Sequence, residues 1–242
     1  MGEYCVAQIL NIAKRIPSHG EQHKERAWKP IQQQSLNKQV LGILGCGGIG
    51  LHTAKFIRNF GIRIIGTTRR CIEHTTSADS KGIELTDDEK SLVDEWYPVD
   101  EESMIEVFRR SDYVICSIPF TPATTNCIKD CHFEALGSEG WFINVARGEV
   151  VDQDAMIKAL NSDVFGGAVL DVTTPEPLPS DHPLWTAKNC LITPHDSPLS
   201  PASFARSFEH FLNNSKRFIK REPLIALVSD VANSKSLNKI FW

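Results

Sequence analysis

Apolar and polar positions follow two patterns along this chain, short apolar runs and longer stretches with helical spacing. The short runs predict strands, because continuous apolar runs of this length are typical of strands buried on both faces. They lie at 39–44, 63–67, 112–117, 141–146, 166–171 and 189–193. Helical spacing between them predicts helices at about 49–60, 101–110, 130–136 and 152–161. This alternation indicates an α/β fold built on a doubly wound parallel sheet.

Two further amphipathic stretches flank this alternation. Residues 3–16 predict a helix with an apolar stripe that some other surface must cover. The stripe consists of Cys5, Ile9, Ile12, Ala13 and Ile16, and Val6 and Leu10 widen it. A second helix is predicted from about Pro201 to Lys220, with its apolar side buried. That side consists of Phe204, Phe208, Phe211, Leu212, Phe218 and Ile219.

Two polar segments connect the predicted elements. Residues 17–36 are polar, and we interpret Trp28 as an isolated anchor within them. Residues 71–96 are acidic, which favours a solvated surface insertion with one or two helical turns. We assign no structure to the residues after Pro223.

The first predicted strand leads into a glycine-rich turn, Gly45-Cys46-Gly47-Gly48-Ile49-Gly50, and the helix predicted at about 49–60 begins in this turn. This context makes GxGxxG a dinucleotide-binding fingerprint of the Rossmann type. Gly45 permits the tight turn, Gly47 lets the backbone approach a pyrophosphate, and Gly50 lets helix and strand pack closely. The N-terminus of the helix favours the phosphates through its free N–H groups and its dipole. An ordinary glycine turn is the alternative interpretation.

The end of the second predicted strand bears on the choice of cofactor. NAD-binding folds carry an acidic residue there, which accepts hydrogen bonds from the ribose hydroxyls. Here the strand ends in Thr67-Thr68-Arg69-Arg70, without a carboxylate. Because guanidinium groups bind phosphate through paired hydrogen bonds, Thr68, Arg69 and Arg70 favour the 2′-phosphate of NADP(H), and NAD(H) is the second possibility. The alternative is that both arginines are surface charges.

Three predicted strands deliver a charged or titratable residue at or just past their carboxyl ends, namely Arg147, Glu176 and His195. Reduction of a 2-oxo acid needs a cation that holds the carboxylate, and it needs a proton donor near neutral pH. A carboxylate beside an imidazole favours the protonated ring and fixes its tautomer. Singly, the three residues suit an ion pair, a loop charge and a structural histidine. Their joint occurrence behind a nucleotide fingerprint favours catalysis.

Composition narrows the alternatives. The chain has 242 residues and a formal net charge of -4, which argues against a dedicated nucleic-acid or membrane surface. No apolar run is long enough to span a bilayer, and residues 1–16 lack the basic start and cleavage site of a signal peptide. The 7 cysteines are scattered, which favours reduced thiols in a cytoplasmic protein over disulfides or a metal site.

Together these segments make the chain resemble the D-isomer-specific 2-hydroxyacid dehydrogenase family. The resemblance rests on residues 42–50, 117–125, 142–155, 167–179 and 191–195. Within the family, the sequence of residues 167–179 and the Thr-Thr-Arg-Arg strand end most resemble the glyoxylate and hydroxypyruvate reductase branch, which favours NADPH.

The resemblance implies roles for individual residues. Arg147 would bind substrate, Glu176 would pair with His195, and His195 would exchange the proton. Cofactor contacts would come from Asp171 on the nicotinamide carboxamide, from Gly48 and Ile49 on the pyrophosphate, and from Ile118, Val145 and Ala146 along the nicotinamide.

The chain departs from the family pattern in two places. Asp196 follows His195 where the family has a small residue, so its carboxylate either alters substrate fit or turns outward. Family chains also have a longer N-terminal part, which forms most of a substrate-binding domain. We therefore expect an interdomain-type helix and linker at 1–36, a dinucleotide-binding domain at 37–200, and a C-terminal helix and tail at 201–242. The stripe of 3–16 would then lack its usual cover, which favours a homodimer.

Two functions follow from this sequence. The first is an NADP(H)-dependent oxidoreductase acting on a small 2-oxo or 2-hydroxy acid such as glyoxylate or hydroxypyruvate. The second is a truncated NADP(H)-binding module with little or no turnover, acting in binding or regulation. The three candidate catalytic residues favour the first, and the short N-terminal part favours the second.

Overall fold

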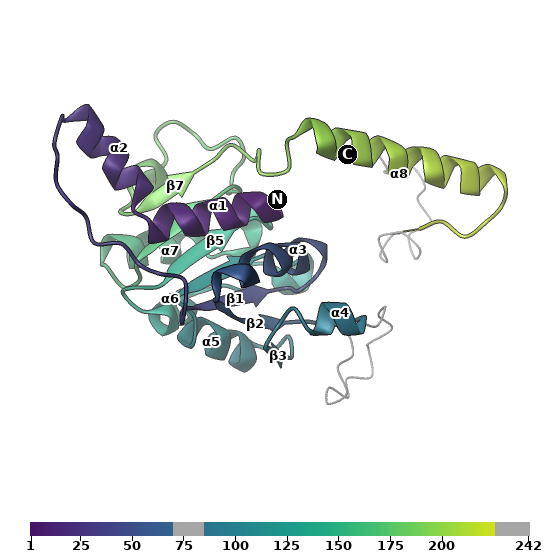
Figure 1. The fold of residues 1–242 in the computed structure, drawn as a ribbon, viewed down its shortest axis with the longest axis horizontal. Coiled ribbons are helices and arrows are strands. Elements are labelled where there is room, and N and C mark those ends of the chain that lie inside the picture. The colour runs from purple at the N-terminus through teal and green to yellow at the C-terminus, as the bar shows by residue number, and fades with distance from the viewer. Residues whose placement is uncertain (70–84, 226–242) are drawn as a thin grey trace. The chain divides into compact units, whose positions relative to one another are not determined.

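The strands form one seven-stranded sheet in a computed structural model that describes residues 1–69 and 85–225 (Figure 1). Its order is β3-β2-β1-β4-β5-β6-β7, and every neighbouring pair is parallel. The strands are β1 Val40–Leu44, β2 Arg63–Thr67, β3 Glu95–Tyr97, β4 Tyr113–Cys116, β5 Trp141–Asn144, β6 Gly167–Leu170 and β7 Cys190–Ile192. The predicted α/β fold with a doubly wound parallel sheet is confirmed.

The strand order places β1 between β2 and β4, so the chain runs outward in both directions from β1. Ligands of such sheets bind beyond the carboxyl ends of the strands, at this reversal of strand order. All strands are parallel, so every carboxyl end lies along one edge of the sheet. We call this the carboxyl edge and the opposite one the amino edge.

Several helices have a polar side chain that caps their first turn. Asp100, Asp152 and Ser200 each accept a hydrogen bond from a backbone N–H of the first turn, which satisfies a group that has no partner inside the helix. The helices are α1 Gly2–Ala13, α2 Ile16–Lys24, α3 Gly48–Ile57, α4 Asp87–Lys90, α5 Glu101–Arg109, α6 Asp130–Leu136, α7 Gln153–Asn161 and α8 Pro201–Ile219.

Two apolar clusters cover the two faces of the sheet. One joins α5, α6 and α7 to strand residues such as Val114 and Phe142. The other joins α1 and α3 to strand residues such as Tyr113 and Ile143. Because alternate residues of β4 and β5 enter opposite clusters, these central strands are buried on both faces, as their continuous apolar runs indicate.

The N-terminal helix differs from the prediction in three respects. The stripe of α1 is covered within this chain, since Cys5, Ile9 and Ala13 are fully buried against α3 and the sheet. The helix ends before Arg15, which has a left-handed backbone (φ 53°), and α2 begins anew with Pro17 in its first turn. A proline cannot donate the hydrogen bond that would continue the first helix. Ile16 is consequently 53% exposed.

Two other expectations about polar segments were wrong. Trp28 is 99% exposed, so it anchors nothing among the described residues. The part of the acidic segment that the structure describes, residues 85–96, is more than a solvated insertion. Leu85 and Val93 are buried in the core, and the residues Glu95–Tyr97 form the edge strand β3 on β2. Three residues are too short a run for periodicity to show a strand. Residues 71–84 lie outside the described residues.

The chain divides into two compact units, Met1–Ser197 and Pro198–Trp242. The described part of the second unit contains α8, and this unit by itself does not cover the apolar side for which burial is predicted. Phe204, Phe208 and Phe218 are 65%, 62% and 73% exposed. Among the described residues, no helix has both the length and the apolar character that crossing a membrane requires.

Candidate active site

The glycine-rich turn lies at the carboxyl end of β1 and is held by its two neighbouring strands. Thr67, the last residue of β2, receives hydrogen bonds from the backbone N–H groups of Gly45 and Cys46, at 3.0 and 2.8 Å. The Ser117 hydroxyl, just past β4, donates to the Gly45 carbonyl at 2.8 Å. The turn is therefore fixed between the two strands that flank β1.

The glycines of the turn are of two kinds: at some a side chain would clash with neighbouring atoms, and at others it would meet open space. Gly45 has φ 86°, and a Cβ at Gly50 would lie 2.8 Å from the Gly45 carbonyl oxygen, so both positions require glycine. A Cβ at Gly47 or Gly48 would meet no atom within 4 Å. These two residues thus leave open space at the start of α3, where N–H groups lack partners within the helix. The turn fits a phosphate group of a bound dinucleotide.

The residues that follow β2 lie beside this turn. Thr68 is buried, and its backbone N–H donates to the Tyr97 carbonyl at 3.2 Å. Arg69 is exposed, and Arg70 lies outside the described residues. An exposed guanidinium at this strand end can reach an anion in solvent.

Arg147 follows β5 in a loop that the Asn144 side chain holds. The Asn144 amide donates to the Arg147 carbonyl and accepts from the Ala146 N–H, each at 3.0 Å. The Arg147 guanidinium is exposed and donates to the Ala146 carbonyl at 2.7 Å. No hydrogen bond or ion pair joins it to Glu176 or His195 within the described part of the chain.

Glu176 and His195 meet, although 19 residues separate them in the sequence. The His195 Nδ1 lies 2.8 Å from the Glu176 Oε2, and the two side chains are 39% and 36% exposed. The other carboxylate oxygen, Oε1, accepts from the Thr173 N–H at 2.9 Å. Because both of its oxygens are bonded, the carboxylate is oriented and can hold the imidazole in one tautomer.

The loops that carry Arg147 and Glu176 pack directly against each other. A Cβ at Gly148 would lie 2.1 Å from the Thr173 carbonyl carbon, so only glycine allows this approach. Gln153 binds the same loop through both ends of its amide, which donates to the Thr174 carbonyl and accepts from the Thr174 N–H. The backbone positions of Arg147 and Glu176 are therefore coupled.

Asp171, just past β6, accepts several hydrogen bonds from the loop that carries His195. Its buried carboxylate accepts from the Thr193 hydroxyl at 2.6 Å and from the backbone N–H groups of Asp196 and Ser197. The His195 N–H donates to the Asp171 carbonyl at 2.9 Å. His195 itself has φ 54°, a backbone conformation that costs energy in a residue other than glycine and that the surrounding bonds must maintain.

The remaining predicted residues line the strand ends. Ile118, Val145 and Ala146 follow β4 and β5 and are 6%, 1% and 6% exposed, and Ile49 lies in the first turn of α3. Sequence reasoning missed Asn144, Thr173, Gln153 and Thr193, whose polar side chains hold the loops. Asn144, Thr173 and Thr193 lie two or three positions from predicted catalytic residues, which is the signal that could have found them.

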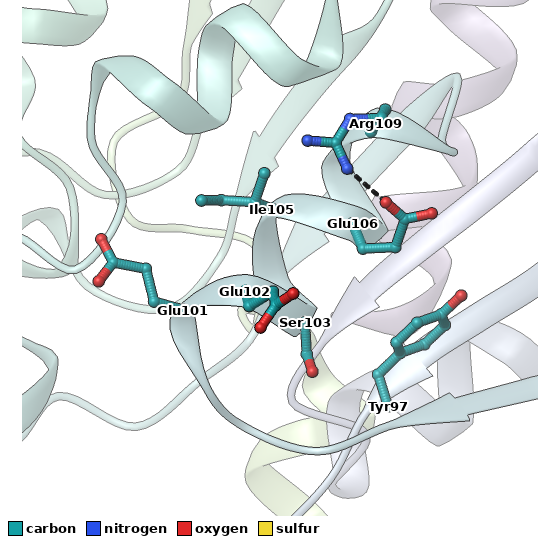
Figure 2. A pocket seen from close by; sticks show the side chains of 7 residues that line it. All are labelled: Tyr97, Glu101, Glu102, Ser103, Ile105, Glu106 and Arg109. Atoms are coloured by element: carbon teal, nitrogen blue, oxygen red, sulfur yellow. Dashed lines mark hydrogen bonds and ion pairs between the residues drawn. The ribbon is translucent and has the colours of Figure 1, made fainter.

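A cavity lies away from these residues, over α5 (Figure 2). Its volume is about 710 Å³, and it contains none of the predicted site residues. The lining residues are Tyr97, Glu101, Glu102, Ser103, Ile105, Glu106 and Arg109. Because three carboxylates line it and Arg109 pairs with Glu106, it does not suit an anionic dinucleotide or 2-oxo acid. Chemistry therefore favours the carboxyl edge over this cavity.

No group of three or more His, Cys, Asp or Glu side chains in the described ranges has a metal-binding arrangement. The carboxyl edge instead carries a glycine-rich turn at the start of α3 and an imidazole–carboxylate pair. Residues 6–197 match the family described as D-isomer specific 2-hydroxyacid dehydrogenase, NAD binding domain. The chain belongs to this family. The predicted family resemblance is thus confirmed.

Curated relatives and solved structures agree with membership of the 2-hydroxyacid dehydrogenase family. The chain is 32% identical over 198 residues to the human glyoxylate reductase/hydroxypyruvate reductase, an alignment that covers 80% of this chain and 55% of that protein. A family protein from Aeromonas salmonicida superposes with a TM-score of 0.79 and 30% identity, covering 94% of this chain and 67% of that one.

A third relative has a bound nucleotide. The NADPH-dependent glyoxylate/hydroxypyruvate reductase of Sinorhizobium meliloti, in complex with NADP and sulfate, superposes with a TM-score of 0.79 and 26% identity. The match covers 96% of this chain and 68% of that chain. The chain spans about half the length of the curated relatives that it matches first, 55% for the human and mouse proteins.

Proposed function

We propose that this dehydrogenase-family domain binds NADP(H) and reduces a small 2-oxo acid, such as glyoxylate or hydroxypyruvate, to the 2-hydroxy acid. The observation that carries the proposal is the 2.8 Å contact between Glu176 and His195 at the edge where the nucleotide turn lies. Singly, each residue has a structural explanation, but an oriented carboxylate on an exposed imidazole is the arrangement of a positioned acid–base group.

His195 is the proposed proton donor. With Nδ1 bonded to Glu176, Nε2 is the ring nitrogen that remains to exchange a proton with substrate. The carboxylate of Glu176 stabilises the positive charge of the protonated ring. Reduction of the carbonyl places negative charge on its oxygen, so a proton delivered from Nε2 completes the alcohol.

Arg147 is the proposed anchor for the substrate carboxylate. Its guanidinium is exposed at the end of β5, on a loop that packs against the loop of Glu176. A guanidinium binds a carboxylate through two parallel hydrogen bonds, which orients the adjoining carbonyl group.

The turn at 45–50 would hold the pyrophosphate, with Gly47 and Gly48 leaving space for it. A bound nicotinamide supplies the hydride, and Asp171, Ile118, Val145 and Ala146 are proposed to surround that ring. Arg69, with Arg70, is proposed to bind a 2′-phosphate, which gives NADPH preference over NADH. The NADP complex of the Sinorhizobium relative supports this choice.

The second candidate is an NADP(H)-binding module with little or no turnover. One observation favours it: among the described contacts the Arg147 guanidinium donates to the Ala146 carbonyl and to neither residue of the Glu176–His195 pair. Residues 1–36, 37–200 and 201–242 remain our proposed divisions. A cytoplasmic location is proposed from the scattered cysteines. A homodimer is also proposed, although the covered stripe of α1 removes the argument that first favoured it.

The test combines binding and turnover. Titration of the chain with NADPH and NADH, followed by fluorescence, measures cofactor affinity. Oxidation of NADPH is then followed with glyoxylate and with hydroxypyruvate, against a reaction without substrate. The proposal expects NADPH binding and turnover with at least one acid. Binding without turnover would support the second candidate, and absence of binding would contradict both.

A further inference from the structure

We propose that Tyr4 is a positioning residue for the catalytic loop, acting through Thr193 and Asp171. The proposal rests on the function proposed above, because it assigns Tyr4 to the loop that carries His195. It concerns a residue of the N-terminal helix, 189 positions from Thr193 in the sequence.

The connection is a continuous chain of short hydrogen bonds. The Tyr4 hydroxyl lies 2.7 Å from the Thr193 Oγ1, and the Thr193 Oγ1 lies 2.6 Å from the Asp171 Oδ1. The same Oδ1 accepts from the Asp196 N–H at 3.0 Å. Three bonds thus lead from α1 to the residue that follows His195.

The donor of each hydrogen bond in this series can be assigned. An ionised carboxylate only accepts hydrogen bonds, so Thr193 must donate its single proton to Asp171. The Thr193 oxygen is then an acceptor toward Tyr4, and the Tyr4 hydroxyl donates. Burial raises the pKa of Tyr4 to about 12, which keeps that hydroxyl protonated. Each bond in the chain therefore polarises the next.

The loop needs such support because of its backbone. His195 has a left-handed conformation, and its own N–H bonds the Asp171 and Thr193 carbonyls. A strained residue at a site persists only when its surroundings over-determine it. Asp171 holds the residues after His195, Thr193 holds Asp171, and Tyr4 fixes Thr193. Packing of α1 on α3 is a separate contribution that leaves the hydroxyl of Tyr4 unexplained.

The experiment removes single hydroxyl groups and measures the loop directly. The variants are Tyr4→Phe and Thr193→Val, and Thr193→Ser is the conservative variant that retains the hydroxyl. Tyr113→Phe is the matched control, because Tyr113 is buried in the same cluster and its hydroxyl points to Gln34, at 3.4 Å, and Gln39 rather than to the His195 loop. Amide hydrogen exchange by NMR reports on the N–H groups of Asp196 and Ser197.

We expect Tyr4→Phe and Thr193→Val to accelerate exchange at Asp196 and Ser197 about five- to tenfold, the equivalent of one hydrogen bond. Thr193→Ser and Tyr113→Phe should leave both amides unchanged. Where the chain turns over, Tyr4→Phe should lower kcat by a larger factor than it weakens NADPH binding, because Asp171 itself is retained. That split separates loop positioning from a general loss of folded protein.

Two results would overturn the proposal. One is unchanged exchange at both amides in Tyr4→Phe, and the other is an equal acceleration throughout the unit, which would mark a purely structural role. The exchange measurement needs no activity. A chain that binds no NADPH would therefore defeat the proposed function, while the exchange data would still decide whether Tyr4 holds the loop.

Discussion

Two carboxylates with basic partners lie at opposite edges of the same sheet. At the carboxyl edge, Glu176 contacts one nitrogen of His195. At the amino edge, Glu95 opens β3 and binds Arg110 through both of its oxygens, at 2.5 and 2.9 Å, and Arg63 adds a third contact at 2.8 Å. The two glutamates are equally exposed, 36% and 34%.

The difference between the pairs lies in what surrounds them. The cation partners of Glu95 are two arginines, which stay charged at all accessible pH values and cannot exchange protons. The partner of Glu176 is an imidazole, whose ring nitrogens can both donate and accept a proton. The amino-edge pair also joins regular elements, whereas the carboxyl-edge pair joins two loops with a left-handed residue. The role proposed for each pair, stability of the fold or proton exchange, therefore follows from its basic partner and its backbone.

Replacing the imidazole is the change with the largest expected effect. In His195→Ala, turnover of glyoxylate or hydroxypyruvate should fall by about 10²–10⁴-fold, because the proton donor is lost. The affinity for NADPH should not change. His23→Ala, at an exposed position of α2, is the control. Turnover that survives in His195→Ala would remove the distinction between the two pairs.

The two ends of β2 offer a second comparison, smaller in effect. Arg69→Ala, past the carboxyl end, should weaken NADPH binding about tenfold or more and leave NADH binding unchanged, since a charge-assisted bond to the 2′-phosphate is lost. Arg63→Ala, at the amino end of the same strand, should alter neither affinity. Fluorescence titration measures both cofactors. Equal weakening of NADPH and NADH by Arg69→Ala would contradict a phosphate contact.

The smallest effect is expected at the amino edge and concerns stability. Hydrogen bonding from Arg110 lowers the pKa of Glu95 from 4.5 to about 2. A carboxyl whose pKa is lower in the folded than in the unfolded chain stabilises the folded protein when it is ionised. This stabilisation is therefore complete above a pH of about 4.5 and is lost as the pH falls toward about 2. The pair is partly exposed, so solvent screening limits its contribution to about 1 kcal/mol.

The variant Glu95→Gln isolates this contribution. At neutral pH it should lower the melting temperature by about 2–4 °C, and the difference from the parent chain should narrow as the pH approaches about 2. Turnover at neutral pH should be unaffected. Thermal melts followed by circular dichroism across this pH range measure the difference. A gap that widens on acidification would contradict the assigned sign.

The sequence predicted most elements because their patterns are local. Six of the strands and the helices between them follow from apolar runs and helical spacing, and the turn at Gly45 follows from its position between a strand and a helix. The edge strand β3 was missed because three residues carry no period. Glu176 and His195 were paired by resemblance, and the structure places them in contact.

Amphipathic helices show the limit of such reasoning. The stripes of α1 and α8 look alike in sequence, yet Cys5 and Ile9 are fully buried by their own unit, and the described part of the second unit offers Phe204 no such cover. The spacing of apolar residues predicts that a helix has an apolar side. The surface that packs against this side comes from residues far away in the sequence, so the spacing does not identify it.

The sequence by itself determined the parallel α/β sheet, the place of the nucleotide turn and the identity of the charged residues at the strand ends, because each depends on neighbouring residues. The tertiary structure alone decided that α1 covers the sheet, that Gly148 lets two loops touch, and that Tyr4 reaches Asp171 through Thr193. These contacts join residues up to 189 positions apart. Only the closure of the fold brings such residues within hydrogen-bonding distance.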